Sequence, residues 1–355
     1  MPSSILIVRL SAIGDVIHTL PALHALRVAF PNARIGWLVE ELSATLLRGH
    51  PELDDLYVIP KKRWRKAPLK MWLNGEKSAF YREVRKAKWE VAIDFQGLSK
   101  SALAAWYSGA PTRIGYAGEN GREVSRVFNN QRVLPPSNAI HVIQKNLSLL
   151  EPLGIHAIDS AAESRFPDFS AEVEELGAVF KTLSAPRFIA LYPGAGWETK
   201  RWPPQYFARL AQILAAESDL PLALLWGPGE ENLCDEILKT AALPTEKLLL
   251  APRTNLRQLA ALIGQSAVFV GGDTGPTHLA AALNIPVVGL YGGSDPIRNG
   301  AWDPTGKTAV LQAKEVPCVP CWKTVCPNPK HIECLWAITP EVAAQAVLDR
   351  LGAVK

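Results

Sequence analysis

Four short segments of the sequence combine glycine with side chains that could bind or activate a substrate. The first, at 11–15, reads Ser-Ala-Ile-Gly-Asp and directly follows the apolar run 5–10. Loops at the carboxyl ends of parallel strands are where α/β folds bind their ligands. Gly14 allows the backbone to turn closely there, and Asp15 falls where a helix should begin. Asp15 is therefore a candidate site residue, although an aspartate at a helix start also serves well as a cap.

The segment at 271–278, Gly-Gly-Asp-Thr-Gly-Pro-Thr-His, is typical of a phosphate-binding turn. Pro276 fits the first turn of a helix that continues through 279–283. The free N–H groups and the dipole of such a helix start bind phosphate, and two threonine hydroxyls suit a pyrophosphate. The alternative is an ordinary tight turn with a capping aspartate. The candidate binding residues in this segment are Asp273, Thr274, Gly275 and His278.

Two more loops, at 192–203 and 227–231, each hold one charged candidate. Lys200 lies just past a glycine-rich stretch, where a cation could neutralise a departing diphosphate. Its alternative is an exposed lysine without a role. Glu230, in Gly-Pro-Gly-Glu-Glu, could direct a carboxylate at ribose hydroxyls, as acidic residues do in nucleotide-binding folds. A plain turn before an acidic helix start is the alternative there.

Positive charge is concentrated in the first half of the chain. Up to Asp168 there are 22 Lys and Arg against 16 Asp and Glu, and the remainder has 16 against 18. The densest run is Lys-Lys-Arg-Trp-Arg-Lys at 61–66. A nucleic-acid surface would interleave such charge with several aromatic side chains, and this run has one, so we expect no nucleic-acid partner. With Arg122, the residues Arg63, Arg65 and Lys66 better suit phosphates and carboxylates of a substrate, or form a solvated loop.

Apolar runs alternating with helical segments predict an α/β fold with parallel sheets covered on both faces. A helix is expected at 16–30. The pattern resets near 166–170, which predicts two Rossmann-like halves with a central cleft between them. We expect one half at 1–168, a second at 169–339, and a C-terminal helix within 340–355 that packs back on the first half. The predicted strands lie at 5–10, 34–40, 56–59, 91–94, 188–192, 222–226, 248–250, 268–270 and 287–290.

The composition predicts a cytoplasmic protein. Hydrophobic residues make up 48% of the chain and charged residues 20%, which is ordinary for a globular protein. No apolar run approaches the roughly 20 residues that span a bilayer. The first apolar stretch lacks a preceding basic region and is interrupted by Asp15, so we expect no secretory signal.

Four of the five cysteines cluster near the end of the chain, with His331 among them. In a cytosolic protein such clustering favours a metal over disulfides, although the spacing is irregular for a zinc ribbon. Zinc or iron is the candidate structural metal. Its candidate ligands are Cys318, Cys321, Cys326 and Cys334. The fifth cysteine, Cys234, is expected to be a small buried hydrophobic residue.

Together the segments 9–23, 199–203 and 273–282 resemble the lipopolysaccharide heptosyltransferases, and the resemblance covers nearly the whole chain. The segments 62–66, 93–101 and 121–123 resemble heptosyltransferase I most closely. The cysteine-rich segment looks more like heptosyltransferase II, which adds the second heptose, so this acceptor remains an alternative.

This resemblance implies the GT-B fold, with the acceptor bound by the first half and the donor by the second. The implied donor is ADP-L-glycero-D-manno-heptose, the implied acceptor is Kdo-lipid A at the inner face of the inner membrane, and the implied reaction inverts the anomeric centre. Asp15 takes the position of the base. Lys200 would hold the diphosphate, so no cofactor is expected for catalysis. The expected donor-binding residues are Gly14, Glu230, Asp273, Thr274, Gly275 and His278.

Two alternatives come from other classes of protein. A nucleotide-binding oxidoreductase would share the fold, but its G-x-G-x-x-G fingerprint is absent from the sequence. A non-catalytic, metal-dependent interaction protein would account for the cysteines, but it would leave Asp15 and Lys200 without a role.

Overall fold

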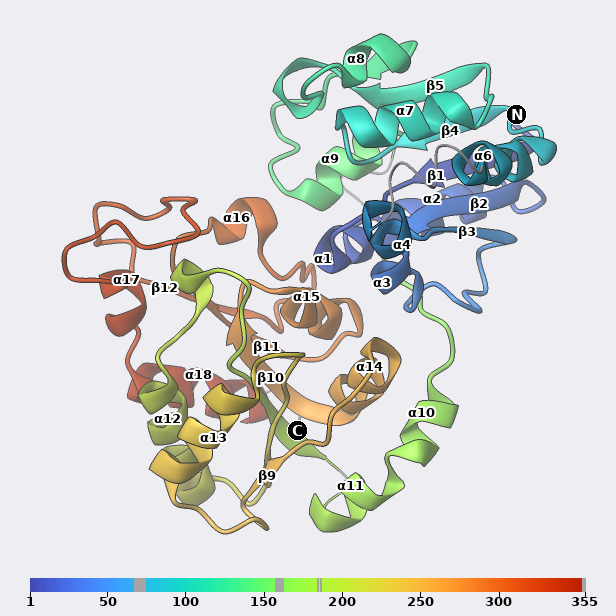
Figure 1. The fold of residues 1–355 in the computed structure, drawn as a ribbon. Coiled ribbons are helices and arrows are strands. Elements are labelled where there is room, and N and C mark those ends of the chain that lie inside the picture. The colour runs from blue at the N-terminus through green and yellow to red at the C-terminus, as the bar shows by residue number, and fades with distance from the viewer. Residues whose placement is uncertain (67–74, 157–162, 184, 186, 353–355) are drawn as a thin grey trace. The chain divides into compact units, whose positions relative to one another are not determined.

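The computed structural model describes residues 1–66, 75–156, 163–183, 185 and 187–352. Its contacts divide the chain into two units, Met1–Pro167 and Asp168–Lys355, each built around one sheet (Figure 1). The division falls one residue before the boundary expected from the sequence. Each unit is described separately below.

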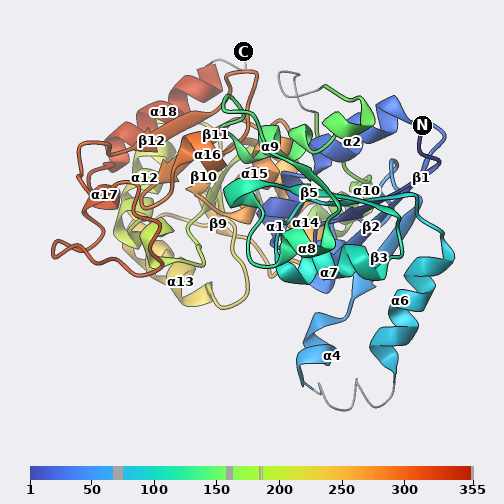
Figure 2. The same ribbon diagram turned by 90° about the horizontal axis from the view of Figure 1, so that it is seen from above.

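The first unit is a six-stranded parallel sheet in the order β3-β2-β1-β4-β5-β6. Its strands are β1 (Ser4–Val8), β2 (Arg34–Glu40), β3 (Asp55–Ile59), β4 (Val91–Asp94), β5 (Thr112–Tyr116) and β6 (Gln131–Val133). Its helices are α1 (Ile13–Ile17), α2 (Leu20–Ala29), α3 (Glu41–Ala44), α4 (Lys61–Lys66), α6 (Glu76–Lys86), α7 (Ser99–Tyr107), α8 (Ser125–Phe128) and α9 (Val142–Ser148). Figure 2 shows α4 and α6 projecting from the sheet of this unit.

The central strands β1 and β4 are buried along their whole length and are mostly apolar, because helices cover both faces of the sheet. Every residue of β1 is buried, and its Leu6 and Val8 join a core cluster with Leu38 and Trp89. Gly36 on β2 shows how tightly that cluster packs. A methyl group at Gly36 would lie 2.4 Å from the ring of Trp89, so only glycine fits beside the indole.

The second unit is also a six-stranded parallel sheet, in the order β12-β11-β10-β7-β8-β9. Its strands are β7 (Phe188–Tyr192), β8 (Leu222–Leu224), β9 (Leu248–Leu250), β10 (Ser266–Gly272), β11 (Val287–Tyr291) and β12 (Ala309–Gln312). Its helices are α10 (Ser170–Glu175), α11 (Gly177–Leu183), α12 (Pro204–Glu217), α13 (Glu231–Ala241), α14 (Leu256–Gln265), α15 (Gly275–Ala282), α16 (Pro296–Asn299), α17 (Glu333–Trp336) and α18 (Pro340–Gly352).

The C-terminal helix α18 packs within the second unit. It contacts α12 and the strands β10, β11 and β12. Its buried residues Ala343, Ala344 and Val347 belong to the core cluster of this unit. The small side chains of α18 fit closely against α12 and the second sheet, and the expectation that this helix packs on the first half stays a prediction.

Helix α12 has 14 residues and is shorter than the roughly 20 residues of a membrane-spanning helix. Throughout the described residues, no helix combines the length and the apolar character that would let it cross a membrane.

Both sheets have a point where the strand order reverses direction. In the first unit this point lies between β1 and β4, and in the second it lies between β7 and β10. The loops that leave neighbouring strands at such a point run in opposite directions, and ligands bind in the crevice that opens between them. The loops that border these two points are 9–12 and 95–98 in the first unit, and 193–203 and 273–274 in the second.

Candidate active site

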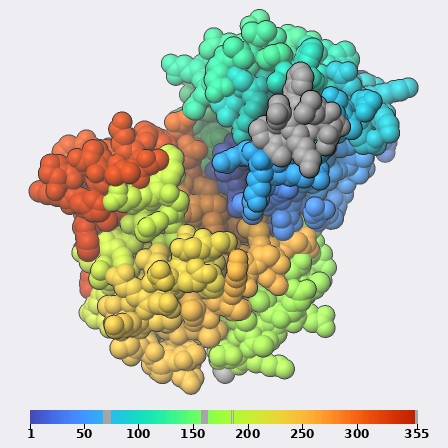
Figure 3. Space-filling model, in the orientation of Figure 1, coloured from blue at the N-terminus to red at the C-terminus, as the bar shows by residue number. Residues whose placement is uncertain are grey.

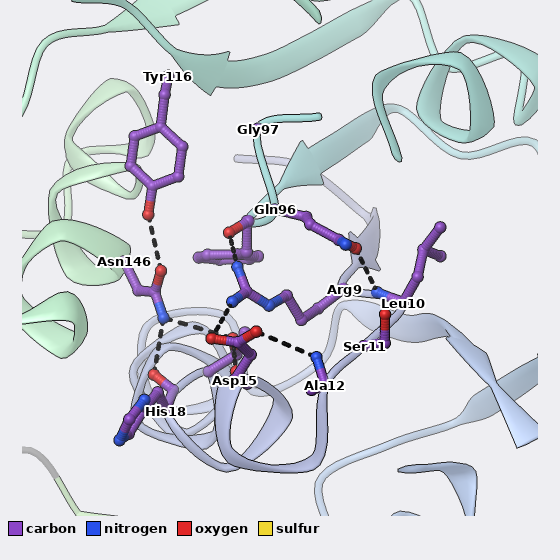
Figure 4. A network of polar contacts seen from close by, with 12 residues as sticks. Arg9, Leu10, Ser11, Ala12, Asp15, His18, Gln96, Gly97, Tyr116 and Asn146 are labelled. Carbon is purple, nitrogen blue, oxygen red and sulfur yellow. Dashed lines mark hydrogen bonds and ion pairs between the residues drawn. The ribbon is translucent and has the colours of Figure 1, made fainter. Parts of the chain in front are cut away.

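Asp15 and Arg9 form the centre of a polar network at the reversal point of the first sheet (Figure 4). Arg9 follows β1, and its Nη2 lies 2.6 Å from Oδ1 of Asp15. The other end of the same guanidinium donates to the carbonyl oxygen of Phe95, which follows β4. The side chain of Arg9 is 8% exposed, whereas that of Asp15 is 38% exposed. A buried cation thus holds a carboxylate that solvent can reach.

The second oxygen of Asp15 accepts a hydrogen bond from the backbone N–H of Ala12 at 3.0 Å. Asp15 therefore does cap α1, as the alternative interpretation of the sequence expected, because its carboxylate accepts one N–H at the start of that helix. Ala12 has no side-chain acceptor, so the reciprocal half of a capping box is missing. Each carboxylate oxygen has room for a second hydrogen bond. Asp15 can therefore cap the helix and still accept a proton from a substrate hydroxyl.

Other residues hold the loop after β1 in place. The side-chain oxygen of Gln96 accepts from the N–H of Leu10 at 3.0 Å, which ties this loop to the one that follows β4. Farther along, Tyr116 donates to Asn146 at 2.7 Å, and Asn146 donates to the carbonyl oxygen of His18 at the end of α1. These bonds fix both ends of the short helix that carries Asp15.

Lys200, Asp273 and His278 come together at the reversal point of the second sheet. The Nζ atom of Lys200 lies 2.6 Å from Oδ2 of Asp273, and Nε2 of His278 lies 3.1 Å from Oδ1 of the same carboxylate. Lys200 comes from the loop after β7, and Asp273 from the loop after β10. His278 lies on α15, so three predicted residues from two loops and one helix form one constellation.

The charges of this constellation stabilise one another. Burial by itself raises the pKa of the Asp273 carboxyl, but the hydrogen bond and charge of His278, followed by the charge of Lys200, outweigh it and hold that pKa well below its usual range. Lys200 also lies over the ring of Trp197, with Nζ 4.5 Å from the ring centre. The Lys200 side chain is 18% exposed, and its ion pair with Asp273 and its contact with Trp197 fix the direction of the ammonium group.

The start of α15 lies beside these charges. Thr274 is the N-cap residue, and its carbonyl oxygen accepts from the N–H groups of Thr277 and His278. Pro276 has no N–H, and Gly275 opens the helix without a side chain to obstruct a ligand. The hydroxyl groups of Thr274 and Thr277 lie 3.2 Å apart. This arrangement of a helix start next to a lysine suits an anionic group such as a diphosphate.

Glu230 lies between two loops of the same unit. Its Oε2 accepts from the hydroxyl of Tyr192 at 2.9 Å and from the N–H of Gly227 at 2.7 Å. Burial, and then the charge of Glu230, raise the pKa of Tyr192. The Glu230 carboxylate packs so closely on Gly194 that a methyl group there would overlap it. Glu230 therefore links the loops after β7 and β8, and both hydrogen bonds go to Oε2, so that among the described residues Oε1 accepts none.

Gly14 belongs to a different unit from the other five predicted donor-binding residues. It belongs to α1 in the first unit, and its carbonyl oxygen accepts from the N–H of His18. The other five belong to the second unit.

The basic run forms α4 and lines a hollow of about 740 Å³ in the first unit. Arg65 and Lys66 line the hollow with Lys61 and Lys62, opposite Glu40 and Glu41. Arg63 instead pairs with Glu76, and Arg122 is exposed, with its backbone N–H donating to the carbonyl oxygen of Gly97. The structure thus gathers two of the four predicted acceptor-binding residues around one hollow.

Two cations of the first unit were not predicted from the sequence. Arg9 orients Asp15, and Lys100 lies 3.2 Å from Glu40 and 3.3 Å from the hydroxyl of Ser11. Arg9 could have been recognised as a charged residue at the end of an otherwise apolar strand. Lys100 gives no comparable signal, because its partners lie 60 and 89 residues away in the sequence.

The four clustered cysteines are engaged in packing. Cys334 is buried in the core of the second unit, Cys318 and Cys326 pack against that core, and Cys321 lies against Gly293. Burial, and then the neighbouring thiols, raise the pKa of Cys334 to about 11. Within the described part of the chain, no three His, Cys, Asp or Glu side chains are placed to hold a metal ion. The predicted zinc or iron therefore finds no support in the structure, whereas Cys234 is buried in the core as expected.

Gly272, the last residue of β10, packs directly against the backbone of Lys200. We expect replacement of Gly272 to destabilise the fold. A methyl group at this position would lie 2.4 Å from the carbonyl oxygen of Lys200. Because backbone cannot rotate away as a side chain can, we expect Gly272→Ala to lower the free energy of unfolding by about 1–3 kcal/mol. Urea denaturation measures the free energy of unfolding of each variant. Gly264→Ala in α14 is the matched control, since open space surrounds it; equal stability of the two variants would contradict the packing described.

Comparison with known proteins identifies the family. The model of glycosyltransferase family 9 (heptosyltransferase) matches residues 78–332. Lipopolysaccharide heptosyltransferase 1 of Pseudomonas aeruginosa is 32% identical over 324 residues, which cover 91% of this chain and 87% of that protein. The oxidoreductase and interaction-protein alternatives are not favoured by these similarities.

Solved structures share the fold. The chain superposes on the Escherichia coli heptosyltransferase WaaC with ADP at a TM-score of 0.77 and 23% identity, covering 98% of this chain and 99% of that one. The same enzyme with ADP-2-deoxy-2-fluoro heptose gives a TM-score of 0.75 at 23% identity and the same coverage. The predicted fold class, α/β with two Rossmann-like units of the GT-B type, is thereby confirmed. This chain belongs to glycosyltransferase family 9, the heptosyltransferases, and is a glycosyltransferase.

Proposed function

We propose that this glycosyltransferase moves heptose from ADP-L-glycero-D-manno-heptose to Kdo-lipid A during synthesis of the lipopolysaccharide inner core. One observation carries the proposal: Lys200 and Asp273 meet at the reversal point of the second sheet, beside the start of α15. A diphosphate leaving group needs positive charge at such a place. The similar Escherichia coli enzyme was solved with ADP and with a fluorinated ADP-heptose, which supports the same donor here.

The donor diphosphate would be held by Lys200, the N–H of Gly275 and the hydroxyl of Thr274. Asp273 keeps Lys200 in place through its ion pair, and His278 in turn fixes Asp273. Charge builds up on the diphosphate as its bond to the sugar breaks. A fixed ammonium group and a helix start stabilise that charge more in the transition state than in the ground state. Glu230 would accept hydrogen bonds from the ribose hydroxyls through Oε1.

Asp15 would act as the general base. A hydroxyl oxygen of the acceptor attacks the anomeric carbon of heptose, the bond from that carbon to the diphosphate oxygen breaks, and ADP leaves with the electron pair. The hydroxyl proton passes to Asp15. Attack and departure on opposite sides of the carbon invert its configuration. Arg9 holds Asp15 in direction, as its 2.6 Å ion pair indicates.

The acidic acceptor would be recognised by the positive charges of the first unit. Arg65 and Lys66 line the hollow beside α4, and Arg63 and Arg122 add exposed charge on the same unit. Kdo carries a carboxylate and lipid A carries phosphates, so guanidinium and ammonium groups suit both. We infer that the protein works at the cytoplasmic face of the inner membrane as a peripheral protein, where such an acceptor is anchored.

Removing charge at Arg63, Arg65 and Arg122 together is expected to raise the Michaelis constant for the acceptor about tenfold or more, because one charged hydrogen bond contributes about 1.5–3 kcal/mol. The constant for ADP-heptose should stay nearly unchanged. Added salt should weaken acceptor binding in the wild type, since exposed charges are screened over about 10 Å at 0.1 M. Steady-state kinetics with each substrate varied at two salt concentrations measures both effects.

The matched control for that experiment removes Arg209, Lys239 and Arg253, which are exposed in the second unit. This control should leave both constants near wild type. A triple variant that changed the donor constant and not the acceptor constant would contradict the assignment of the acceptor to the first unit.

The nucleotide specificity provides a test of the proposed function that needs no acceptor. Isothermal titration calorimetry with ADP, UDP and NAD should show binding of ADP and weaker or no binding of the other two. Preference for NAD would favour an oxidoreductase, and preference for UDP would point to another sugar donor.

A further inference from the structure

A second pocket of the first unit lies between α6 and the end of α7, apart from the hollow beside α4. Its volume is about 540 Å³. Three cations, Lys77, Arg82 and Arg85, line it on the α6 side, and Trp106 and Tyr107 line it on the α7 side. Neither the proposed donor site nor the proposed base uses any of these residues.

The three cations are not neutralised by carboxylates of the described chain. The acidic residues of α6 pair elsewhere: Glu76 accepts from Arg63, and Glu83 pairs with Lys86 at 2.7 Å. Among the described residues, no ion pair joins Lys77, Arg82 or Arg85 to an acid. The pocket therefore has a net positive charge, which favours an anionic ligand.

The aromatic wall of the pocket is ordered by contacts with the same cations. The Nζ atom of Lys77 lies 5.6 Å from the ring centre of Tyr107, and Nε of Arg85 donates to the carbonyl oxygen of Tyr107 at 2.8 Å. Tyr107 also packs on Tyr81, with ring centres 4.8 Å apart. A ligand in this pocket would thus meet positive charge and a fixed aromatic surface together.

The surface next to the pocket exposes large apolar side chains. Trp106 is 44% exposed and contacts Phe128 of α8 at a ring distance of 6.1 Å. Val124 and Val127, in or next to α8, are 54% and 77% exposed. In the space-filling view, the segment around α6 lies at the surface of this unit (Figure 3). Exposed tryptophan and valine beside lysine and arginine are typical of surfaces that lie in a membrane interface.

We propose that this pocket binds the phosphate group of an anionic membrane lipid and holds the protein on the bilayer. The cations match the phosphate in charge, the rings of Trp106 and Tyr107 contact the glycerol and upper acyl region, and the exposed valines enter the interface. The biological benefit rests on the proposed function. Helix α6 packs on α4 through Phe80 and Trp64, with ring centres 5.6 Å apart, so the lipid pocket and the acceptor hollow belong to one helical pair.

Co-sedimentation with vesicles tests the proposal. Wild-type protein should bind vesicles that contain phosphatidylglycerol and bind phosphatidylcholine vesicles much more weakly. The variant Lys77→Gln/Arg82→Gln should lose roughly 25-fold in binding to the anionic vesicles, because each basic residue near such a surface contributes about fivefold. Trp106→Ser should weaken binding to both kinds of vesicle. The control Lys239→Gln/Arg253→Gln removes one lysine and one arginine from the second unit and should bind as the wild type does.

Two outcomes would overturn the proposal. One is a pocket variant that binds anionic vesicles as tightly as the control does. The other is binding of glycerol phosphate that the pocket variant loses while its vesicle binding stays intact, which would make the ligand a soluble phosphate. With acceptor dispersed in detergent, the pocket variant should keep wild-type turnover. A wild type that bound vesicles but transferred no heptose would refute the proposed function and leave the lipid pocket in place.

Discussion

Replacing Asp15 by asparagine is expected to lower turnover by roughly 10²–10⁴-fold, the range for loss of a general base, with ADP affinity almost unchanged. Asparagine keeps an oxygen that can accept from the N–H of Ala12, so the cap at the start of α1 is retained. It loses the ability to take a proton, and it leaves the buried Arg9 without its carboxylate. Single-turnover kinetics and ADP titration measure the two properties separately.

Two further variants make this result specific to the base. Asp15→Glu keeps a proton acceptor and should recover part of the lost activity. Asp295→Asn removes a charge from another helix cap, whose carboxylate accepts from the N–H of Ile297, and should leave the rate unchanged. Turnover of Asp15→Asn within a few-fold of wild type would exclude Asp15 as the base.

Replacing Lys200 by alanine is expected to weaken ADP binding by roughly ten- to a hundredfold and to slow transfer as well. A charge-assisted hydrogen bond contributes about 1.5–3 kcal/mol, and Lys200 would meet the diphosphate in both the bound and the reacting state. The change also leaves Asp273 with only His278 as a partner, so part of the loss should come from a disturbed helix start. Calorimetry gives the affinity and steady-state kinetics gives the rate.

The control for Lys200 is Lys239→Ala, an exposed lysine on α13 of the same unit. It should bind ADP as the wild type does. If Lys200→Ala kept both wild-type affinity and wild-type rate, Lys200 would lie outside the site and its ion pair with Asp273 would be purely structural.

Much of the fold could be predicted because buried strands leave a clear pattern. The strand at 34–40 has the predicted bounds, since six of its seven residues are buried. Strands β5, β6 and β12 were missed. They are short, partly exposed strands at or next to sheet edges, with polar residues such as Thr112, Arg113 and Gln131 in them. Exposure on one side removes the continuous apolar run that identifies a central strand.

One helix was predicted where the structure has two. The segment 16–30 divides into α1, which ends at Ile17, and α2, which begins at Leu20. Pro21 lies in the first turn of α2 and has no N–H to donate to the preceding turn. A proline inside a helical pattern therefore marks the start of a new helix here.

The sequence predicts which loops carry the candidate site residues, but it does not predict which side chains those residues contact. Glycine-rich turns after apolar runs identified Asp15, Lys200 and Asp273 from the sequence. Their partners depend on which strands become neighbours: Arg9 reaches Phe95 because β1 pairs with β4, and Lys200 reaches Asp273 because β7 pairs with β10. The spacing of residues along the chain does not reveal the order of the strands in each sheet, so it cannot predict these contacts. The metal expected at the cysteine cluster finds no support among the described residues, because the thiols there pack against the core without forming a set of metal ligands.

The central claim is heptose transfer from an ADP-linked donor, and one measurement tests it most directly. Purified protein is incubated with ADP-L-glycero-D-manno-heptose and Kdo-lipid A, and the lipid product is analysed by mass spectrometry while released ADP is quantified. We predict that the acceptor gains one heptose for each ADP released, and that an acceptor already carrying the first heptose gains none. ADP release without a heptosylated lipid, or modification of the heptose-bearing acceptor alone, would contradict the account.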